Sequence, residues 1–211
     1  MATGDGVLCT QVFAEEMALI QCDELRQFVV DVFEALCPVY FWTVPASTSG
    51  RYHPSVALGQ GGLIRHVKLA VWWGKELCRA LDVPDKREER GQHLDEVTTA
   101  LLLHDLVKNG FEVDGKMKRS AKATASHGAW LCEAIWKQVL QGQANERQRL
   151  VLFAIAGHMG IWTADDLAKY RPASRKLGST ERQIAMLVHI ADYAASRKVD
   201  AKAKELTTAT P

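Results

Sequence analysis

The sequence predicts an all-α protein with one short β-hairpin. Apolar residues recur every three or four positions in several long segments, the spacing that gives a helix one apolar face. Strand-like alternation around a tight-turn signal, Asp114-Gly115, occurs in one segment, residues 111–118. The composition, 47% hydrophobic and 24% charged in a chain of 211 residues, is typical of a soluble globular domain. We therefore expect a single domain over residues 1–211, with its core at residues 53–199.

The N-terminal part is predicted to be helical scaffold followed by a long loop. Residues 8–36 carry apolar side chains at helical spacing and predict one or two amphipathic helices. Residues 37–62 are rich in Pro, Ser, Gly and Tyr, and no regular element fits their pattern. Loops of this length inside compact domains often carry binding function. The loop ends where a helix over residues 63–81 begins, and His66 lies on the apolar stripe of that helix, so we expect it to face the interior.

Two helices are expected in the middle of the chain, on either side of the predicted hairpin. The first, at residues 94–108, presents His104 and Asp105 directly after a run of apolar residues. The second, at residues 125–140, carries His127. Both helices thus bring residues of metal-ligand type next to apolar faces.

Two more helices complete the predicted fold. Residues 146–158 follow Asn145, which predicts an N-cap with a capping box. Residues 181–199 form the last helix, and Thr180 is predicted to open it with a second capping box. The tail, residues 200–211, is rich in Lys, Ala and Thr and is expected to fray.

Composition and charge narrow the classes of function. A formal net charge of +1 gives no overall attraction for nucleic acid or for an anionic membrane. No segment approaches the roughly 20 apolar residues that span a bilayer, and the first residues do not resemble a signal peptide. The five cysteines form no C-x-x-C pair and are expected to be reduced core residues. We therefore expect a cytoplasmic protein that does not bind membranes.

The adjacent pair His104-Asp105 is the strongest chemical signal in the sequence. Burying an imidazole and a carboxylate beside an apolar run is costly, and a divalent metal ion commonly compensates that cost. Other residues of ligand type lie on separate helical segments: His66, His127, His158 and Asp192. Together they offer four imidazoles and two carboxylates, which exceeds one tetrahedral zinc site and suits two ions that share Asp105. The expected metals are Mn, Fe, Mg, Co or Ni, among which the sequence does not choose.

The order of these motifs resembles the HD-domain superfamily of metal-dependent phosphohydrolases, in its version with extra histidines. The resemblance covers residues 53–197 and includes small HD proteins of bacteria and their phages. Gly61-Gly-Leu-Ile-Arg-His66 is similar to the first-histidine motif of the family. Leu102-Leu-His-Asp-Leu-Val-Lys108 is similar to the H-D-x-x-K motif, and Ile190-Ala-Asp192 to the final aspartate. The Gly-Tyr-Pro sequence of the cyclic-di-GMP subfamily is absent, which argues against that substrate.

The resemblance implies a compact HD-domain helical bundle and an assignment of ligands. One metal ion would bind four residues, His66, His104, Asp105 and Asp192. The other would share Asp105 with His127 and His158. Catalysis would fall to Asp105 and Lys108, with a metal-bridged hydroxide hydrolysing the phosphate ester of a nucleotide or short oligonucleotide. Further residues are candidates for binding substrate along with Lys108: Arg51, His53, Arg65, Trp162 and Arg197.

Several alternatives stay open at the level of the sequence. The chain could be a single-strand nuclease, an HD-type di-iron oxygenase, or a binding module that a metal stabilises without turnover. His127 and His158 could be core histidines beside a single metal ion. His189 could donate a hydrogen bond to a neighbouring ligand or bind metal itself. The sequence does not indicate the oligomeric state.

Overall fold

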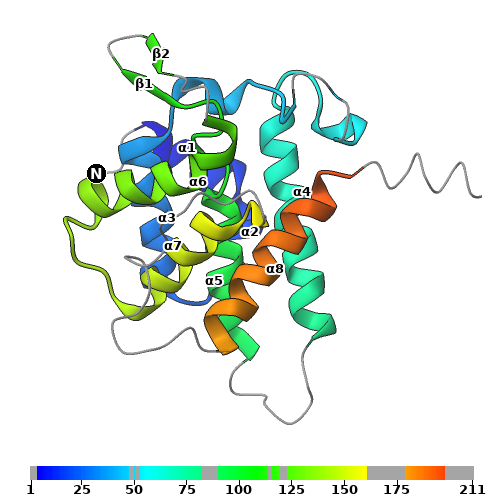
Figure 1. Ribbon diagram of the computed structural model, residues 1–211, viewed down its shortest axis with the longest axis vertical. Helices are drawn as coiled ribbons and strands as arrows, with labels where there is room; N and C mark the ends of the chain where they lie inside the picture. The colour runs from blue at the N-terminus through cyan, green and yellow to red at the C-terminus, as the bar shows by residue number, and fades with distance from the viewer. Residues whose placement is uncertain are drawn as a thin grey trace, which may run out of the picture.

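The computed structural model describes residues 4–47, 50, 53–81, 90–113, 116–118, 123–160 and 179–197. These residues form a helical bundle, as Figure 1 shows, and the all-α class predicted from the sequence is confirmed. Within the described residues, no helix combines the length and the apolar character needed to cross a membrane. The tail at residues 200–211 and the predicted turn at residues 114–115 lie outside the described part of the chain.

The N-terminal scaffold contains three helices, where the sequence predicts one or two. They are α1 (Gly4–Val12), α2 (Ala14–Met17) and α3 (Asp23–Leu36). Phe13, at the junction of the first two, is fully buried, and its ring packs against Phe33 and Phe41 with ring centres 5.9 and 6.4 Å apart. The chain turns at this aromatic contact because a buried Phe anchors it there. Apolar spacing alone does not distinguish one bent segment from two short helices.

The loop predicted at residues 37–62 contains two short 3₁₀ turns, η1 (Val39–Trp42) and η2 (Ser55–Ala57). The prediction that no regular element fits this segment is therefore wrong for these two turns. Backbone hydrogen bonds also hold the loop against itself and the following helix, from Ala46 N to Ala57 O at 3.0 Å and from Leu63 N to Val44 O at 3.0 Å. The loop is thus packed onto the start of the next helix, at the entrance to the site described below.

The centre of the molecule is α5 (Arg90–Leu103), which packs against α4 (Gly62–Ala80), α7 (Glu146–Gly157) and α8 (Ser179–Ala195). Figure 1 shows α8 beside α4 and α7, with α5 behind it. The last turn of α5 is entirely apolar, and Leu101, Leu102 and Leu103 are fully buried. The residues that follow this turn therefore emerge inside the bundle and not at its surface.

Several helix boundaries differ from the sequence prediction, and two of them concern predicted residues directly. α5 ends at Leu103 instead of Lys108, so that His104 and Asp105 lie just beyond the helix. α8 begins at Ser179, which places Thr180 inside the helix and not at its N-cap. By contrast, the predicted capping box at Asn145 is present, with both of its hydrogen bonds to Gln148. Helix ends are the least predictable part of a helix because the apolar pattern continues through them.

The remaining elements lie around α7 and at one edge of the bundle. α6 (Ala123–Ala134) packs against α7 and continues into a π-helical turn, η4 (Ile135–Val139). Two three-residue strands, β1 (Phe111–Val113) and β2 (Lys116–Lys118), pair antiparallel. Figure 1 shows them projecting from one end of the molecule.

Candidate metal centre

The site is built around the point where α5 ends. After Leu103 the backbone tightens, with hydrogen bonds from Leu106 N to Leu103 O and from Lys108 N to Asp105 O, both at 3.0 Å. Leu106 is fully buried and anchors this turn in the core. The tight turn brings Lys108 Nζ to 2.5 Å from Asp105 Oδ2. The end of the helix thus presents an imidazole, a carboxylate and an ammonium group in one small volume.

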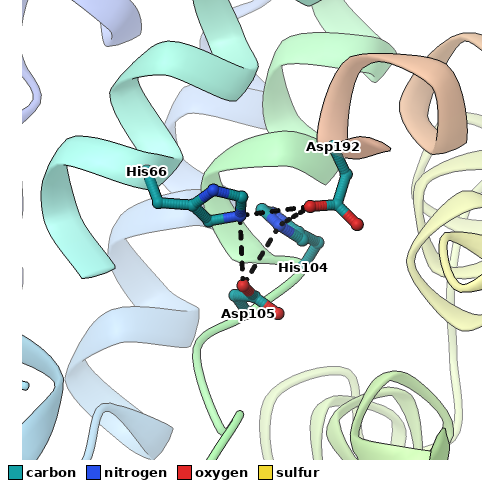
Figure 2. Close-up of side chains that lie close together, drawn as sticks. All are labelled: His66, His104, Asp105 and Asp192. Atoms are coloured by element: carbon teal, nitrogen blue, oxygen red, sulfur yellow. Dashed lines mark ion pairs between the residues drawn. The ribbon is translucent and has the colours of Figure 1, made fainter. Parts of the chain in front are cut away.

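Four residues from three segments form the first ligand group. His66 comes from α4, Asp192 from α8, and His104 and Asp105 from the end of α5, as Figure 2 shows. His66 Nε2 lies 3.3 Å from Asp105 Oδ2 and 3.1 Å from Asp192 Oδ1. His104 Nε2 lies 3.5 Å from each of the same two oxygens. The ligand atoms of this group all lie within 4.8 Å of one another, so that one ion could contact all four.

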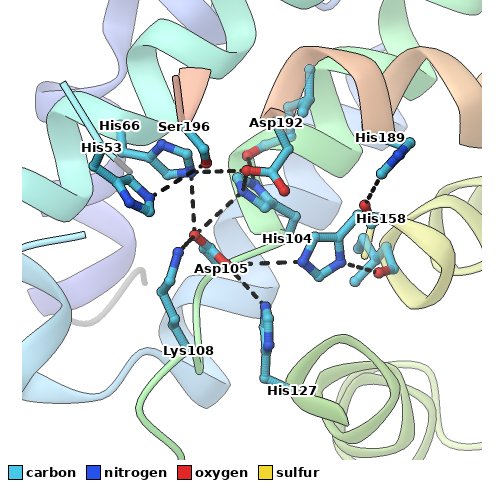
Figure 3. Close-up of polar contacts among 12 residues, drawn as sticks. His53, His66, His104, Asp105, Lys108, His127, His158, His189, Asp192 and Ser196 are labelled. Atoms are coloured by element: carbon cyan, nitrogen blue, oxygen red, sulfur yellow. Dashed lines mark hydrogen bonds and ion pairs between the residues drawn. The ribbon is translucent and has the colours of Figure 1, made fainter. Parts of the chain in front are cut away.

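Three residues form a second group on the other oxygen of Asp105. Asp105 Oδ1 lies 2.9 Å from His127 Nε2 and 3.9 Å from His158 Nε2. The two imidazole rings are 4.7 Å apart between centres, and Figure 3 shows both turned toward the carboxylate. Asp105 therefore divides its two oxygens between the groups. This is the arrangement expected of a carboxylate that bridges two ions.

A glycine next to His127 makes the second group possible. A Cβ atom on Gly128 would lie 2.6 Å from Ile155 O and 3.0 Å from His158 Nδ1, both too close for any larger residue. Because glycine has no Cβ atom, α6 can approach α7 closely enough for the His127 and His158 rings to pack together. The sequence analysis missed this residue. The signal that could have found it is the glycine directly after a histidine on an apolar helical segment.

The tautomers of two histidines test whether this donor set fits a metal. His104 Nδ1 lies 2.7 Å from Leu101 O, and His158 Nδ1 lies 2.6 Å from Ile155 O. A carbonyl oxygen accepts and cannot donate, so each Nδ1 carries a proton and, in the neutral ring, each Nε2 presents a lone pair. Metal-bound histidines are commonly oriented by such a second hydrogen bond.

The unpartnered nitrogens point to the same conclusion. Nε2 of His66, His104 and His158 is buried and accepts no hydrogen bond from any described residue. For His66 and His104, the nearest charged atoms are carboxylate oxygens, which repel a lone pair unless a cation or a proton lies between them. The residues therefore fit a divalent cation with nitrogen and oxygen ligands.

Electrostatics keep the two aspartates in the charged form that a metal requires. Burial opposes ionisation of Asp105, but Lys108 and His104 outweigh it and hold the pKa of that carboxyl well below its usual range. Burial likewise opposes ionisation of Asp192, but the imidazoles of His104 and His66 beside it outweigh burial and hold its pKa well below the usual range. Burial lowers the pKa of His158 to about 3, so that its ring is neutral at pH 7.

A cavity of about 490 Å³ opens onto the ligands. Asp105, Asp192, His127 and His158 all line it, so that both ligand groups reach the same space. Lys108 lines the cavity as well. Three further lining residues were not predicted from the sequence: Met159, Tyr193 and Ser196. Ser196 follows Asp192 by four residues, a helical spacing that could have indicated it. No such spacing relates Tyr193 to Asp192.

The predicted substrate-binding residues have different positions. His53 and Arg197 line the cavity. Burial, with a contribution from Lys108, lowers the pKa of His53 to about 4 and leaves its ring neutral at pH 7. Arg65 does not reach the cavity: its side chain donates to Val56 O at 2.6 Å and to Leu58 O at 2.9 Å. Arg65 therefore holds the loop in place, and substrate binding by Arg65 stays a prediction. Two other candidates, Arg51 and Trp162, lie outside the described residues.

Comparisons with models of protein families, with curated proteins and with solved structures return no match to this chain. The site is therefore interpreted from its own geometry. What that geometry shows is a buried cluster of histidines and aspartates that could hold metal, at the wall of an open cavity.

Proposed function

We propose that this protein is a metal-dependent phosphohydrolase of the HD type, which hydrolyses a phosphate ester of a nucleotide or short oligonucleotide. The observation that carries the proposal is the position of Asp105. Its two oxygens serve two groups of potential metal ligands, and both groups face one cavity. Two ions held close together can stabilise both the attacking and the leaving oxygen of a displacement at phosphorus.

The residues of the chain have distinct parts in the proposed reaction. When bound, the ions supply Lewis acidity toward the phosphoryl oxygens and lower the pKa of a water molecule. Asp105 and Asp192, held ionised, offset the positive charge of the ions. Lys108 lines the cavity beside Asp105 and is positioned to bind a non-bridging oxygen of the phosphate.

The dimensions and charge of the site favour a small substrate. A cavity of about 490 Å³ lies within the range typical of small-molecule sites, which is roughly 300–1,000 Å³. A net charge of +1 provides little of the electrostatic attraction on which binding to long nucleic acids depends. We therefore favour a nucleotide, or the end of a short oligonucleotide, over a long single strand.

A hydrolysis screen tests this proposal. Purified protein is incubated with nucleoside mono-, di- and triphosphates, cyclic nucleotides and short oligonucleotides, each with Mn²⁺, Mg²⁺, Co²⁺, Ni²⁺ or Fe²⁺. We expect release of phosphate or of a shortened nucleotide with at least one metal, and none from Asp105→Ala. Activity that survives in Asp105→Ala would assign the reaction to another site or to a contaminant.

The same screen separates the alternative functions. Iron-dependent oxygen consumption without hydrolysis of any phosphate ester would replace the proposal with a di-iron oxygenase. Cleavage limited to longer single strands, falling steeply with added salt, would indicate a nuclease. Metal binding without turnover of any substrate would leave a binding module.

A further inference from the structure

His189 contacts one of the proposed ligands without belonging to either ligand group. It lies on α8, one turn before Asp192, and Figure 3 shows it beside His158 on the side away from Asp105. We propose that His189 is a positioning residue that determines the affinity of the second metal site by holding His158 in place. This inference rests on the two-metal centre of the proposed function.

The first support is a hydrogen bond between α8 and the end of α7. His189 Nδ1 lies 2.7 Å from the backbone oxygen of His158. Because that oxygen can only accept, His189 Nδ1 carries the proton and donates it. α7 ends at Gly157. The carbonyl oxygens at the end of a helix have no N–H donor within the helix. His189 supplies the missing donor for the carbonyl of His158.

The second support is the shape of the turn that follows. Gly160 has φ of +61°, a left-handed conformation that favours glycine. A Cβ atom there would lie 2.5 Å from His189 Cε1 and 2.8 Å from its Nε2. The turn after His158 therefore packs directly over the His189 ring. Hydrogen bond and packing are independent, and both fix the His158 backbone relative to α8.

The third support is the position of His158 at the end of its helix and at the edge of its ligand group. Its ring is oriented by its own helix, through Nδ1 and Ile155 O, but its backbone lies where α7 ends. It is also the more distant imidazole of its group, with Nε2 3.9 Å from Asp105 Oδ1, against 2.9 Å for His127. Among the described residues, no hydrogen bond or ion pair joins His189 to a side chain of the first group. Loosening His189 should thus affect the second ion and spare the first.

The test compares two substitutions of His189 by their metal stoichiometry. In Asn, the amide nitrogen lies where the imidazole Nδ1 lies, so His189→Asn retains the donor, whereas His189→Leu removes it. Loss of such an orienting contact typically weakens metal binding 10–100-fold, so we expect about that loss for the second ion in His189→Leu. Mn²⁺ titration calorimetry gives both affinities, and the spin coupling of paired Mn²⁺ in electron paramagnetic resonance reports the second site independently of activity.

Several results would contradict or separate the two proposals. Wild-type affinity for both ions in His189→Leu would overturn the inference and leave the proposed function standing. Equal weakening of both ions would assign His189 a general structural role and overturn it too. A wild-type protein that binds fewer than two ions would overturn the two-metal centre itself, together with the inference.

Two further variants guard against misfolding. If His189→Leu does not fold, Gly160→Ala makes the same test from the other side, because its methyl group displaces the His189 ring. Met186→Ala is the control on α8, since Met186 is half exposed and lies outside the cavity lining. We expect two ions with wild-type affinity in Met186→Ala and in His189→Asn, and selective loss of the second ion in Gly160→Ala.

Discussion

The two ends of α5 both bury charged residues, but they compensate those charges in different ways. Near its beginning lies an ion-pair network of Asp95, Glu96 and Arg147, and just beyond its end lies the candidate metal centre around Asp105. Both networks contain two buried or nearly buried carboxylates. In the first, donors of the protein contact both carboxylates, and one oxygen of Glu96 has no partner among the described residues. The second leaves Nε2 of His66, His104 and His158 without a hydrogen-bond partner among the described residues.

The ion-pair network joins three parts of the chain. Asp95 accepts hydrogen bonds from Gln21 N at 2.8 Å and Cys22 N at 3.0 Å, just ahead of α3. Arg147 on α7 contacts Asp95 Oδ2 at 3.0 Å and Glu96 Oε1 at 2.5 Å. The network therefore fastens the N-terminal scaffold and α7 to α5. Removing one partner from such a buried network would leave the remaining charge uncompensated, which destabilises the fold.

The metal centre differs in what it lacks. Its carboxylates face imidazoles whose Nε2 atoms have no donor or acceptor among the described residues, apart from His127, which contacts Asp105. Burial of charge alone does not identify a functional site, because both ends of α5 bury charge. Incomplete compensation beside a cavity does, because a cation can complete it.

The largest expected effect comes from the same substitution at each end of α5. Asp105→Asn removes the charge that two ions would share, and we expect hydrolysis to fall by about 10³-fold or more. Asp95→Asn should leave turnover within about threefold but destabilise the protein by about 1–3 kcal/mol, because one backbone N–H loses its acceptor. Steady-state kinetics and urea unfolding measure the two effects. A comparable loss of turnover in both variants would erase the distinction between the networks.

A second prediction concerns the cation of the ion-pair network. Arg147→Met leaves Asp95 and Glu96 without their shared partner, and breaking a buried ion pair costs about 3–5 kcal/mol. We expect a loss near the lower figure, since the Arg147 side chain is 31% exposed. Urea unfolding measures it, while the number of bound ions should not change. An unchanged free energy of unfolding would show that Arg147 contributes little to the network.

The third prediction concerns removal of metal from the candidate metal centre, at the C-terminal end of α5. Metal that binds the folded chain stabilises it by about 2.7 kcal/mol at a free concentration 100 times its Kd. Thermal unfolding with Mn²⁺ and then with EDTA should therefore show a melting temperature about 5–10 °C lower in EDTA. Asp95→Asn should retain this difference and Asp105→Asn should lose most of it. Retention of the full difference in Asp105→Asn would place the stabilising ion elsewhere.

The smallest expected effect is a pH dependence in the ion-pair network. Burial raises the pKa of Glu96 above 4.5 although Arg147 opposes the shift, and its Oε2 has no partner among the described residues. The folded state thus holds this proton more tightly than the unfolded chain does. The corresponding stability is fully present below pH 4.5 and is lost as the pH rises through the folded-state pKa.

Glu96→Gln replaces the ionisable carboxyl by a neutral amide and provides the control. Urea unfolding between about pH 4 and 7 should show wild type losing stability relative to Glu96→Gln as the pH rises. A wild-type advantage that grows with pH would mean that attraction to Arg147 outweighs burial. The candidate metal centre is the same in wild type and in Glu96→Gln, so its own pH dependence cancels from the difference in stability.

Much of the fold and of the site could be predicted from the sequence because each depends on local pattern. Apolar spacing indicated α4 and α7 within a residue or two of their observed ends. The Asn145 cap followed from two side chains that lie three residues apart. Residues of ligand type on separate helical faces indicated the cluster before any contact between them was known. Periodicity did not indicate where α5 ends, how the N-terminal scaffold divides into helices, or that the Arg65 side chain contacts the loop.

The sequence by itself determined that a mostly helical chain carries histidines and aspartates on several apolar segments, since both features are written in residue type and spacing. Tertiary structure alone decided how those residues meet. The two oxygens of Asp105 separate the ligands into two groups because α4 and α8 approach from one side and α6 and α7 from the other. Contacts such as Gly128 on Ile155 and His189 on His158 join residues distant in sequence, and no local pattern encodes a distance across the core.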